Sequence, residues 1–266
     1  MKRRDVLKTM AIAGLAAGTS GAAAMAQTTA QTFVLVHGAW HGGWCRSRVA
    51  DRLRLAGHQV FTPTQTGLGE RKHLLSREIT LDTFTRDIAN VIEAEELSNV
   101  VLVGHSFGGL AISGVADAMP DRLRHLVYLD SLMVEGGKSP FDSLPPEIVA
   151  ARRKAAEETS GGLSLPAPPP SAFGISDATD TEWVKRRLTP HPLGTYTSAL
   201  NIKGPVGNSL PRTYIHCTNP SYAALEGSRK WVKAQPGWRW AEIATGHDAM
   251  VMAPEELTRM LIGVTS

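Results

Sequence analysis

Two hydrophobic patterns alternate along most of this chain. Short apolar runs of strand length occur at 33–36, 59–62, 99–103, 124–129, 213–217 and 239–243. Apolar residues at helical spacing fill the intervals at 45–55, 81–92, 108–118, 222–234 and 254–262. Alternation of strands with helices is typical of a parallel sheet whose crossover helices cover both faces. We therefore predict one α/β domain with a mostly parallel sheet of about six strands.

The alternation is interrupted between Ser131 and Leu210. This stretch holds a helical patch at 147–158, two adjacent glycines and the proline-rich run 166–170. An insertion of this length inside a compact domain is usually functional. We expect a lid over about 132–210 that rests on the working edge of the sheet, with a solvated linker as the alternative.

The first 26 residues have the character of an export signal. A charged start with the pair Arg3-Arg4 precedes a soft stretch rich in Ala and Gly, which ends in the A-x-A pattern of Ala24 and Ala26. The paired arginines, two apolar residues and Lys8 resemble the bacterial twin-arginine signal. We predict cleavage after Ala26 and export of the mature domain, 27–266, to the periplasm. A general secretory signal and an ordinary charged first helix are the alternatives.

The charge of the chain without this predicted signal differs from that of the whole sequence. The 266 residues have a formal charge of +3, but four of the 28 basic residues and only one of the 25 acidic residues lie in the signal. The remaining chain is neutral and has no basic stripe, so we expect no nucleic-acid partner. Its hydrophobic content suits a large core and excludes a disordered chain. It has no apolar run of membrane-spanning length, so we expect no membrane association after signal removal.

The strongest chemical signal is the run Gly104-His105-Ser106-Phe107-Gly108, which follows an apolar strand-length segment and opens a helical stretch. In that context G-x-S-x-G is the nucleophile elbow of α/β-hydrolases. Glycine at both flanking positions permits a turn tight enough to present the serine at the mouth of the sheet. We therefore predict Ser106 as a nucleophile.

Together with the segment 33–44 (FVLVHGAWHGGW), this motif resembles the α/β-hydrolase branch that contains plant methylesterases, hydroxynitrile lyases and many bacterial esterases. The resemblance covers about 31–264 and is weakest across the expected lid. It implies an oxyanion hole formed by the backbone N–H groups of Ala39 and Phe107. Two such donors stabilise the negative oxygen of a tetrahedral intermediate. A tight turn without a ligand role is the alternative for the loop after the first strand.

A serine of ordinary pKa needs a base, and the chain has nine histidines. His247 follows the last predicted strand and Gly246, and it precedes the final helix. That position matches the chain order serine, acid, histidine. We therefore predict His247 as the general base.

The acid has two candidates. Many hydrolases of this fold carry it after the penultimate strand, but residues 218–222 contain no carboxylate, and the nearest one is Glu226 in the following helix. Some carry it after an earlier strand, where Asp130 lies at the edge that presents the nucleophile. We predict Asp130, with Glu226 as the alternative. Asp248 is excluded because a sequence neighbour cannot easily reach the ring nitrogen of His247.

Two departures separate this chain from the hydroxynitrile lyases of the same branch. Those enzymes have a threonine in the loop after the first strand and a lysine directly after the catalytic histidine. This chain has Gly38 and Asp248 at those places. Without the lysine no cation would hold a leaving cyanide, so the sequence favours an esterase over a lyase.

Signals for cofactors and metals are weak. The loop at 67–69 lacks the third glycine of a dinucleotide site, and His37 and His41 stand in a glycine-rich loop rather than on a helix. We expect no cofactor and no metal. Cys45 and Cys217 are too few for a disulfide scaffold. We expect two buried free thiols, although an oxidising compartment would permit a disulfide.

These residues predict an exported, metal-free serine hydrolase that cleaves small carboxylic esters through an acyl-enzyme. Gly38, Trp40 and Trp183 are expected to line its substrate pocket. The charge runs 152–154 and 185–187 are interpreted as solvated helix faces. A lactonase, an amidase or a carbon–carbon hydrolase would use the same triad, and a non-catalytic ligand-binding protein on this fold is a further alternative.

Overall fold

The computed structural model describes residues 30–264. The predicted signal and its cleavage point therefore lie outside the described residues.

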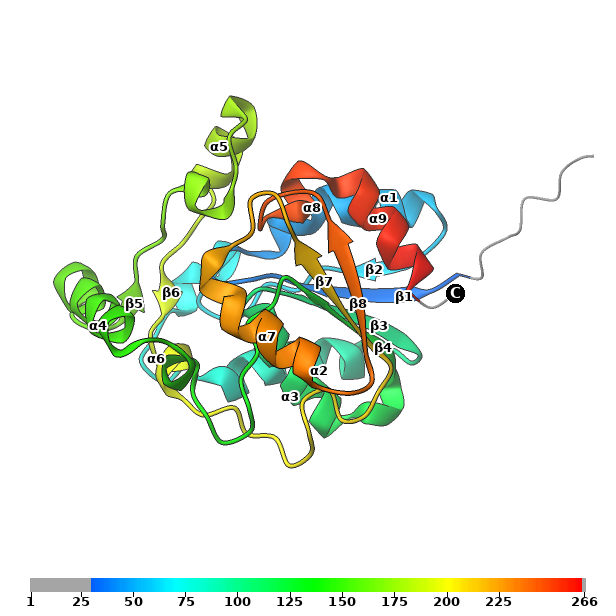
Figure 1. The fold of residues 1–266 in the computed structure, drawn as a ribbon, viewed down its shortest axis with the longest axis horizontal. Coiled ribbons are helices and arrows are strands. Elements are labelled where there is room, and N and C mark those ends of the chain that lie inside the picture. Colours follow the sequence, from blue (N-terminus) through cyan, green and yellow to red (C-terminus); the bar gives the residue numbers. More distant parts are fainter. Residues whose placement is uncertain (1–29, 265–266) are drawn as a thin grey trace, which may run out of the picture.

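Six parallel strands form the main sheet, in the order β2-β1-β3-β4-β7-β8 (Figure 1). The strands are β1 (Thr32–Val36), β2 (Gln59–Phe61), β3 (Val100–His105), β4 (Leu123–Leu129), β7 (Arg212–Cys217) and β8 (Trp238–Ile243). Every neighbouring pair in this sheet runs parallel. The predicted fold class and the number of strands are confirmed.

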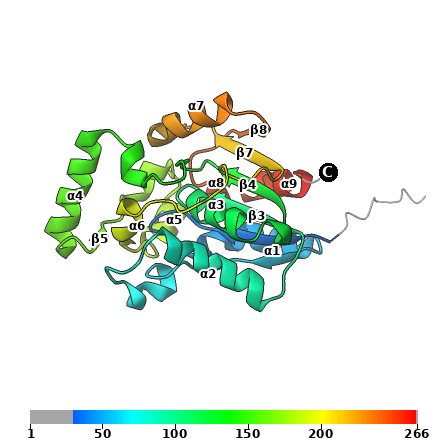
Figure 2. The same ribbon diagram turned by 90° about the horizontal axis from the view of Figure 1, so that it is seen from below.

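Helices cover both faces of the sheet. One face carries α1 (Ser47–Leu55), α8 (Ala249–Met252) and α9 (Pro254–Gly263), and the other carries α2 (Leu81–Ala94), α3 (Gly108–Ala118) and α7 (Glu226–Ala234) (Figures 1 and 2). Short 3-10 helices lie at 43–46, 69–74, 120–122, 140–143, 170–173 and 223–225. Among the helices of residues 30–264, none is long and apolar enough to cross a membrane.

The sequence pattern explains how these elements pack. All six residues of β3 are buried, as expected for a central strand of a parallel sheet. The following helix α3 is buried continuously from Gly108 to Ala116, so it packs inside the domain on all sides. By contrast α2 buries one face, at Leu81, Phe84, Ile88 and Ile92. The central strand and α3 thus hold the turn between them rigidly.

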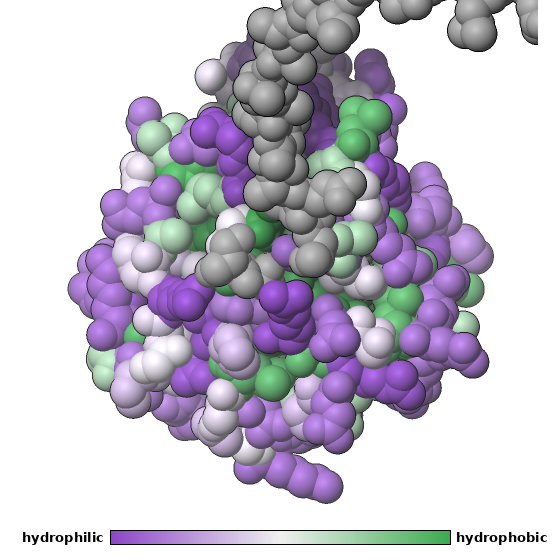
Figure 3. Space-filling model, turned by 90° about the vertical axis from the view of Figure 1, so that its right-hand side faces the viewer, coloured by the Kyte–Doolittle hydropathy of each residue, from purple (hydrophilic) through white to green (hydrophobic). Residues whose placement is uncertain are grey.

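The segment between β4 and β7, which we call the cap segment (residues 132–210), has secondary structure of its own. It contains α4 (Pro146–Ser160), β5 (Ser164–Leu165), α5 (Ala178–Lys185), β6 (His191–Pro192) and α6 (Gly194–Thr197). Its elements lie beyond the carboxyl ends of the strands, at the left of Figure 1. Seen from the opposite side, the molecule presents mainly hydrophilic residues with apolar ones in small patches (Figure 3).

Candidate active site

Ser106 occupies a strained turn between β3 and α3. Its φ angle is 51°, in the left-handed region that few residues other than glycine adopt. A Cβ added at Gly104 would lie 2.8 Å from the carbonyl oxygen of Gly108, and one added at Gly108 would lie 2.5 Å from that of His37. Both flanking glycines are therefore required by close backbone contacts. The turn presents Ser106 to a pocket under the cap segment.

Asp130 and His247 meet at the same edge of the sheet. Asp130 follows β4, and His247 lies in the loop between β8 and α8. His247 Nδ1–H donates a hydrogen bond of 2.7 Å to Asp130 Oδ2, and both side chains are buried. The guanidinium of Arg229 lies 3.8 Å from the other carboxylate oxygen, Oδ1. With its proton on Nδ1, the ring keeps Nε2 available as a proton acceptor.

The alternative acid, Glu226, lies outside this arrangement. It is an exposed residue in the first turn of α7, and its Oε1 lies 2.6 Å from Lys230 Nζ in an ion pair. The hydrogen bond from Lys230, followed by the charge of Lys230, lowers the pKa of Glu226. Glu226 thus forms a surface ion pair with a residue four positions along its own helix.

The backbone N–H groups of Ala39 and Phe107 are free to donate hydrogen bonds, as an oxyanion hole requires. Both residues line the pocket that contains Ser106. No acceptor within residues 30–264 takes a hydrogen bond from either N–H. Gly38 packs so closely that an added Cβ would lie 2.9 Å from Ser106 Cβ. This close approach brings the loop after β1 against the nucleophile.

The pocket is lined by both sequence-predicted and unpredicted residues. Trp40 lines it, as do the cap-segment residues Leu144, Arg152 and Tyr196. Trp183 does not line it. It packs edge-on against Trp44, with ring centroids 5.1 Å apart, beneath two arginine side chains.

Two pocket residues were not singled out by the sequence. Tyr222 follows the penultimate strand and stacks on the ring of His247 at a centroid distance of 4.3 Å. Arg152, which the sequence assigned to a solvated helix face, is half-buried and lines the pocket. No sequence signal indicates this role, because Arg152 stands in a run of three basic residues whose other two members, Arg153 and Lys154, are exposed. Only their different directions on α4 distinguish them.

Further buried histidines support the two loops of the site. His41 Nε2 lies 3.0 Å from Asp248 Oδ2, which joins the loop after β1 to the loop that carries His247. His105 Nε2–H donates to the carbonyl oxygen of His247 over 2.9 Å. Asp248 therefore faces His41 and does not orient His247.

His37 is held as a neutral ring. Its Nδ1–H donates to the carbonyl oxygen of Gly38 over 2.8 Å, and its Nε2 accepts from the N–H of Gln65 over 3.1 Å. Burial lowers the pKa of His37 to about 3. This ring therefore fixes the backbone of the loop after β1 and is not a candidate base.

The two cysteines are free and buried, as predicted. Burial raises the pKa of the Cys45 thiol to about 12 and that of Cys217 well above its ordinary value.

Comparison with known proteins assigns this arrangement to a family. A sequence profile described as "Alpha/beta hydrolase family" matches residues 33–260. The chain belongs to the α/β-hydrolase family. The resemblance seen in the sequence is therefore confirmed.

Relatives of this α/β-hydrolase include bacterial and plant esterases. The "Carbendazim hydrolyzing esterase" of Nocardioides sp. (strain SG-4G) is 42% identical over 237 residues, which cover 86% of this chain and 97% of the relative. "Methylesterase 2" of Arabidopsis thaliana is 28% identical over 88% of this chain and 95% of its own length. The chain is a carboxylic ester hydrolase, as the serine motif predicted.

Solved structures share the fold of this hydrolase. An extracellular alpha/beta-hydrolase from a Paenibacillus species has a TM-score of 0.76 at 23% identity, covering 88% of this chain and 98% of that one. A pyrethroid hydrolase from Sphingobium faniae JZ-2 has a TM-score of 0.67 at 21% identity, covering 88% and 96%. These similarities show that the chain shares the overall fold of these proteins.

Proposed function

We propose that this α/β-hydrolase cleaves small carboxylic esters with a triad of Ser106, His247 and Asp130. The observation that carries the proposal is the 2.7 Å hydrogen bond between His247 and Asp130 at the sheet edge that presents Ser106. A buried carboxylate in this position holds the imidazole tautomer and stabilises the imidazolium without itself taking the proton. Proton transfer by a positioned base contributes about 10²–10⁴ in rate.

The reaction then proceeds in two balanced halves. Ser106 Oγ attacks the ester carbonyl while its proton passes to His247 Nε2, and the negative oxygen accepts hydrogen bonds from the N–H groups of Ala39 and Phe107. The C–O bond breaks, and the alcohol leaves with the proton from His247. Water, activated by His247, releases the carboxylic acid and restores the serine. Each donor of the oxyanion hole is worth about 10²–10³ in rate.

The test is pre-steady-state hydrolysis of p-nitrophenyl acetate. We expect a burst of p-nitrophenol equivalent to the enzyme, followed by slower turnover, because an activated aryl ester acylates the serine faster than water removes the acetyl group. Ser106→Ala should abolish both phases, and Ser171→Ala, at an exposed serine of the cap segment, should retain them. An unchanged burst in Ser106→Ala would contradict the proposal.

Carbendazim is a second candidate substrate, favoured by the 42% identity with the esterase that bears its name. It is a methyl carbamate, whose carbonyl is open to the same attack by serine. Release of 2-aminobenzimidazole by the wild type, lost in Ser106→Ala, would establish this activity. Hydrolysis of p-nitrophenyl acetate without release of 2-aminobenzimidazole would exclude carbendazim as a substrate.

We also propose that residues 1–26 direct export by the twin-arginine route, on the strength of the Arg3-Arg4 pair and the A-x-A pattern before Gln27. In a bacterial host, esterase activity should appear in the periplasmic fraction, with Gln27 at the new N-terminus. Replacing both arginines by lysine should retain the precursor in the cytoplasm. Continued export of that variant would indicate a general secretory signal instead.

A further inference from the structure

The space beside Ser106 is small and shares lining residues with two larger cavities. The pocket at the nucleophile holds about 30 Å³, little more than a water molecule. A cavity of about 880 Å³ lies between the cap segment and α7, and one of about 410 Å³ lies between α4 and residues 165–168. Arg152 lines all three spaces. It is therefore a wall residue common to the space beside Ser106 and to both larger cavities.

The position of His247 distinguishes the two larger cavities. The leaving alcohol must lie beside this ring, because His247 supplies its proton. The ring stacks on Tyr222, which lines the smaller cavity and not the larger one. The alcohol part thus belongs on the side of the smaller cavity, and the acyl part belongs in the larger one. Leu132, Leu144 and Ala224 line both that larger cavity and the pocket at Ser106, so they form the passage between them.

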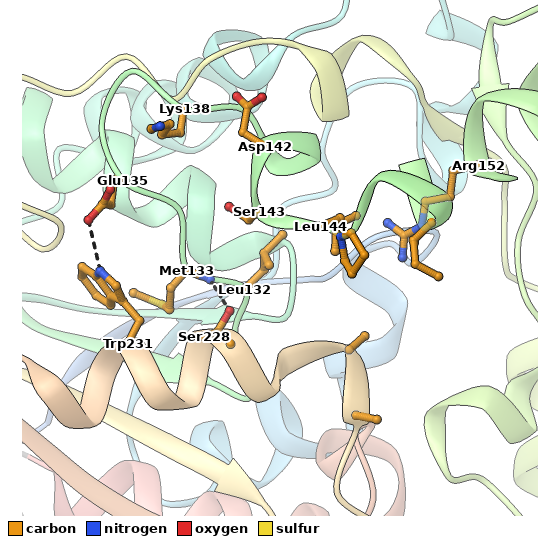
Figure 4. Close-up of a pocket in the computed structure, with 15 residues that line it drawn as sticks. Leu132, Met133, Glu135, Lys138, Asp142, Ser143, Leu144, Arg152, Ser228 and Trp231 are labelled. Carbon is orange, nitrogen blue, oxygen red and sulfur yellow. Dashed lines mark hydrogen bonds between the residues drawn. The ribbon is translucent and has the colours of Figure 1, made fainter. Parts of the chain in front are cut away.

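Arg152 brings a positive charge to this passage. Figure 4 shows its side chain reaching from α4 toward Leu144. The guanidinium lies over the ring of Tyr196, 5.2 Å from the centroid. In the described part of the chain no carboxylate lies within ion-pair distance of it.

The acidic residues of the larger cavity are engaged elsewhere. Glu135 accepts a hydrogen bond from Trp231 Nε1 over 3.3 Å, and Asp142 accepts from the N–H of Ser139 over 2.7 Å. Figure 4 shows Glu135 at the opposite end of the cavity from Arg152 and Asp142 near the top of the view, away from the guanidinium. A half-buried guanidinium without a carboxylate partner is complementary to an anionic ligand.

We infer that Arg152 is a specificity-determining residue that selects esters with an anionic group on the acyl part, such as half-esters of dicarboxylic acids. This inference rests on the proposed function, since it assigns the substrate class of the same site. A carboxylate at the far end of an acyl chain would pass Leu144 and form charge-assisted hydrogen bonds with the guanidinium. An uncharged chain of equal length would leave Arg152 without that partner.

The test compares mono-p-nitrophenyl suberate with p-nitrophenyl octanoate, whose acyl chains have the same number of carbons. For each variant we define the selectivity as kcat/KM for the suberate divided by kcat/KM for the octanoate. Arg152→Gln should lower this selectivity by roughly 10- to 100-fold, because charge-assisted hydrogen bonds are among the strong ones. Arg152→Lys should lower the selectivity by a smaller factor, because lysine keeps the positive charge but lacks the forked geometry of the guanidinium.

Arg153→Gln is the matched control, because Arg153 is the next residue of α4 and its guanidinium lies over Phe141, 5.0 Å from the ring centroid. Its selectivity should equal that of the wild type. In the wild type, added NaCl should lower the selectivity, because salt screens an interaction between charges. Because Lys138 also lines this cavity, the salt effect shows only that a charge there takes part, and the Arg152 variants assign it to Arg152.

The outcomes separate the two proposals. Equal selectivity in the wild type and Arg152→Gln, with both esters hydrolysed more slowly by the same factor, would make Arg152 a packing residue of the cap segment and overturn the inference. A wild type that prefers the octanoate and shows no salt effect would also overturn it. Failure of the wild type to hydrolyse either ester would contradict the proposed function itself.

Discussion

His247 Nδ1 lies 2.7 Å from Asp130 Oδ2, although 117 residues separate the two in the chain. Asp130 follows β4 and His247 follows β8, and β7 lies between these strands in the sheet. The contact forms because the carboxyl ends of parallel strands meet at one edge. The sheet itself therefore sets the distance between the two side chains, and it also brings Ser106 from β3 to that edge.

Asp130→Asn should lower kcat for p-nitrophenyl acetate by about 10³–10⁴, because an amide at this position favours the wrong imidazole tautomer. Glu226→Gln should remain within about twofold of the wild type, since exposed ion pairs within a helix contribute little. Steady-state kinetics of the two purified variants decides between the candidate acids. If Glu226→Gln alone lost activity, the assignment of Asp130 would be wrong.

Gly38→Ala should impair catalysis more than stability. The added Cβ would lie 2.9 Å from Ser106 Cβ and 3.0 Å from His105 Nδ1, so the loop that carries Ala39 must move away from the nucleophile. Misplacing one oxyanion donor should lower kcat by about 10²-fold. Gly263→Ala is the control, because its Cβ meets nothing within 4 Å. A Gly38→Ala enzyme with normal kcat would show that this loop does not serve the reaction.

Stability should fall as the pH drops from about 6.5 toward 4, and His125 should contribute to that loss. Burial, reinforced by the charges of Arg239 and Arg124, lowers the pKa of His125 to about 4, below its ordinary value of 6.5. Between these values the unfolded chain binds a proton that the folded protein does not. The contribution of His125 is therefore complete above pH 6.5 and is lost through this window.

The measurement is the melting temperature at pH 7.5 and pH 5. His125→Gln keeps a polar partner for Thr213, whose hydroxyl lies 2.9 Å from His125 Nε2. This variant should show a smaller drop between the two pH values than the wild type. An identical drop in both proteins would indicate that His125 does not titrate in this range.

Neither cysteine should react in the folded enzyme. Cys45 and Cys217 are both inaccessible to solvent, and burial disfavours the thiolate that is the reactive species. Ellman's reagent should detect almost no thiol under native conditions and both thiols after denaturation without reductant. Detection of thiols only after reduction would instead indicate a disulfide.

The sequence by itself determined the elements nearest the chemistry. The run from Val100 to Ala118 predicts a buried strand, a glycine-flanked turn and a helix because each of these depends on contacts within a few residues. The prediction of His247 as the base rests on its place after the last strand, which is again local information. The α/β architecture followed from the alternation of two periodicities along the whole chain.

Only the tertiary structure decided which distant residues meet. In the structure Glu226 lies on the surface of α7, whereas Asp130 contacts His247. Trp183 packs against Trp44 and does not line the pocket in which the sequence placed it. The structure also separates Arg152 from the solvated residues beside it on α4. These outcomes depend on the direction in which each side chain leaves its element and on the packing of the cap segment over the sheet. Spacing along the chain determines neither, because both arise from contacts between residues far apart in sequence.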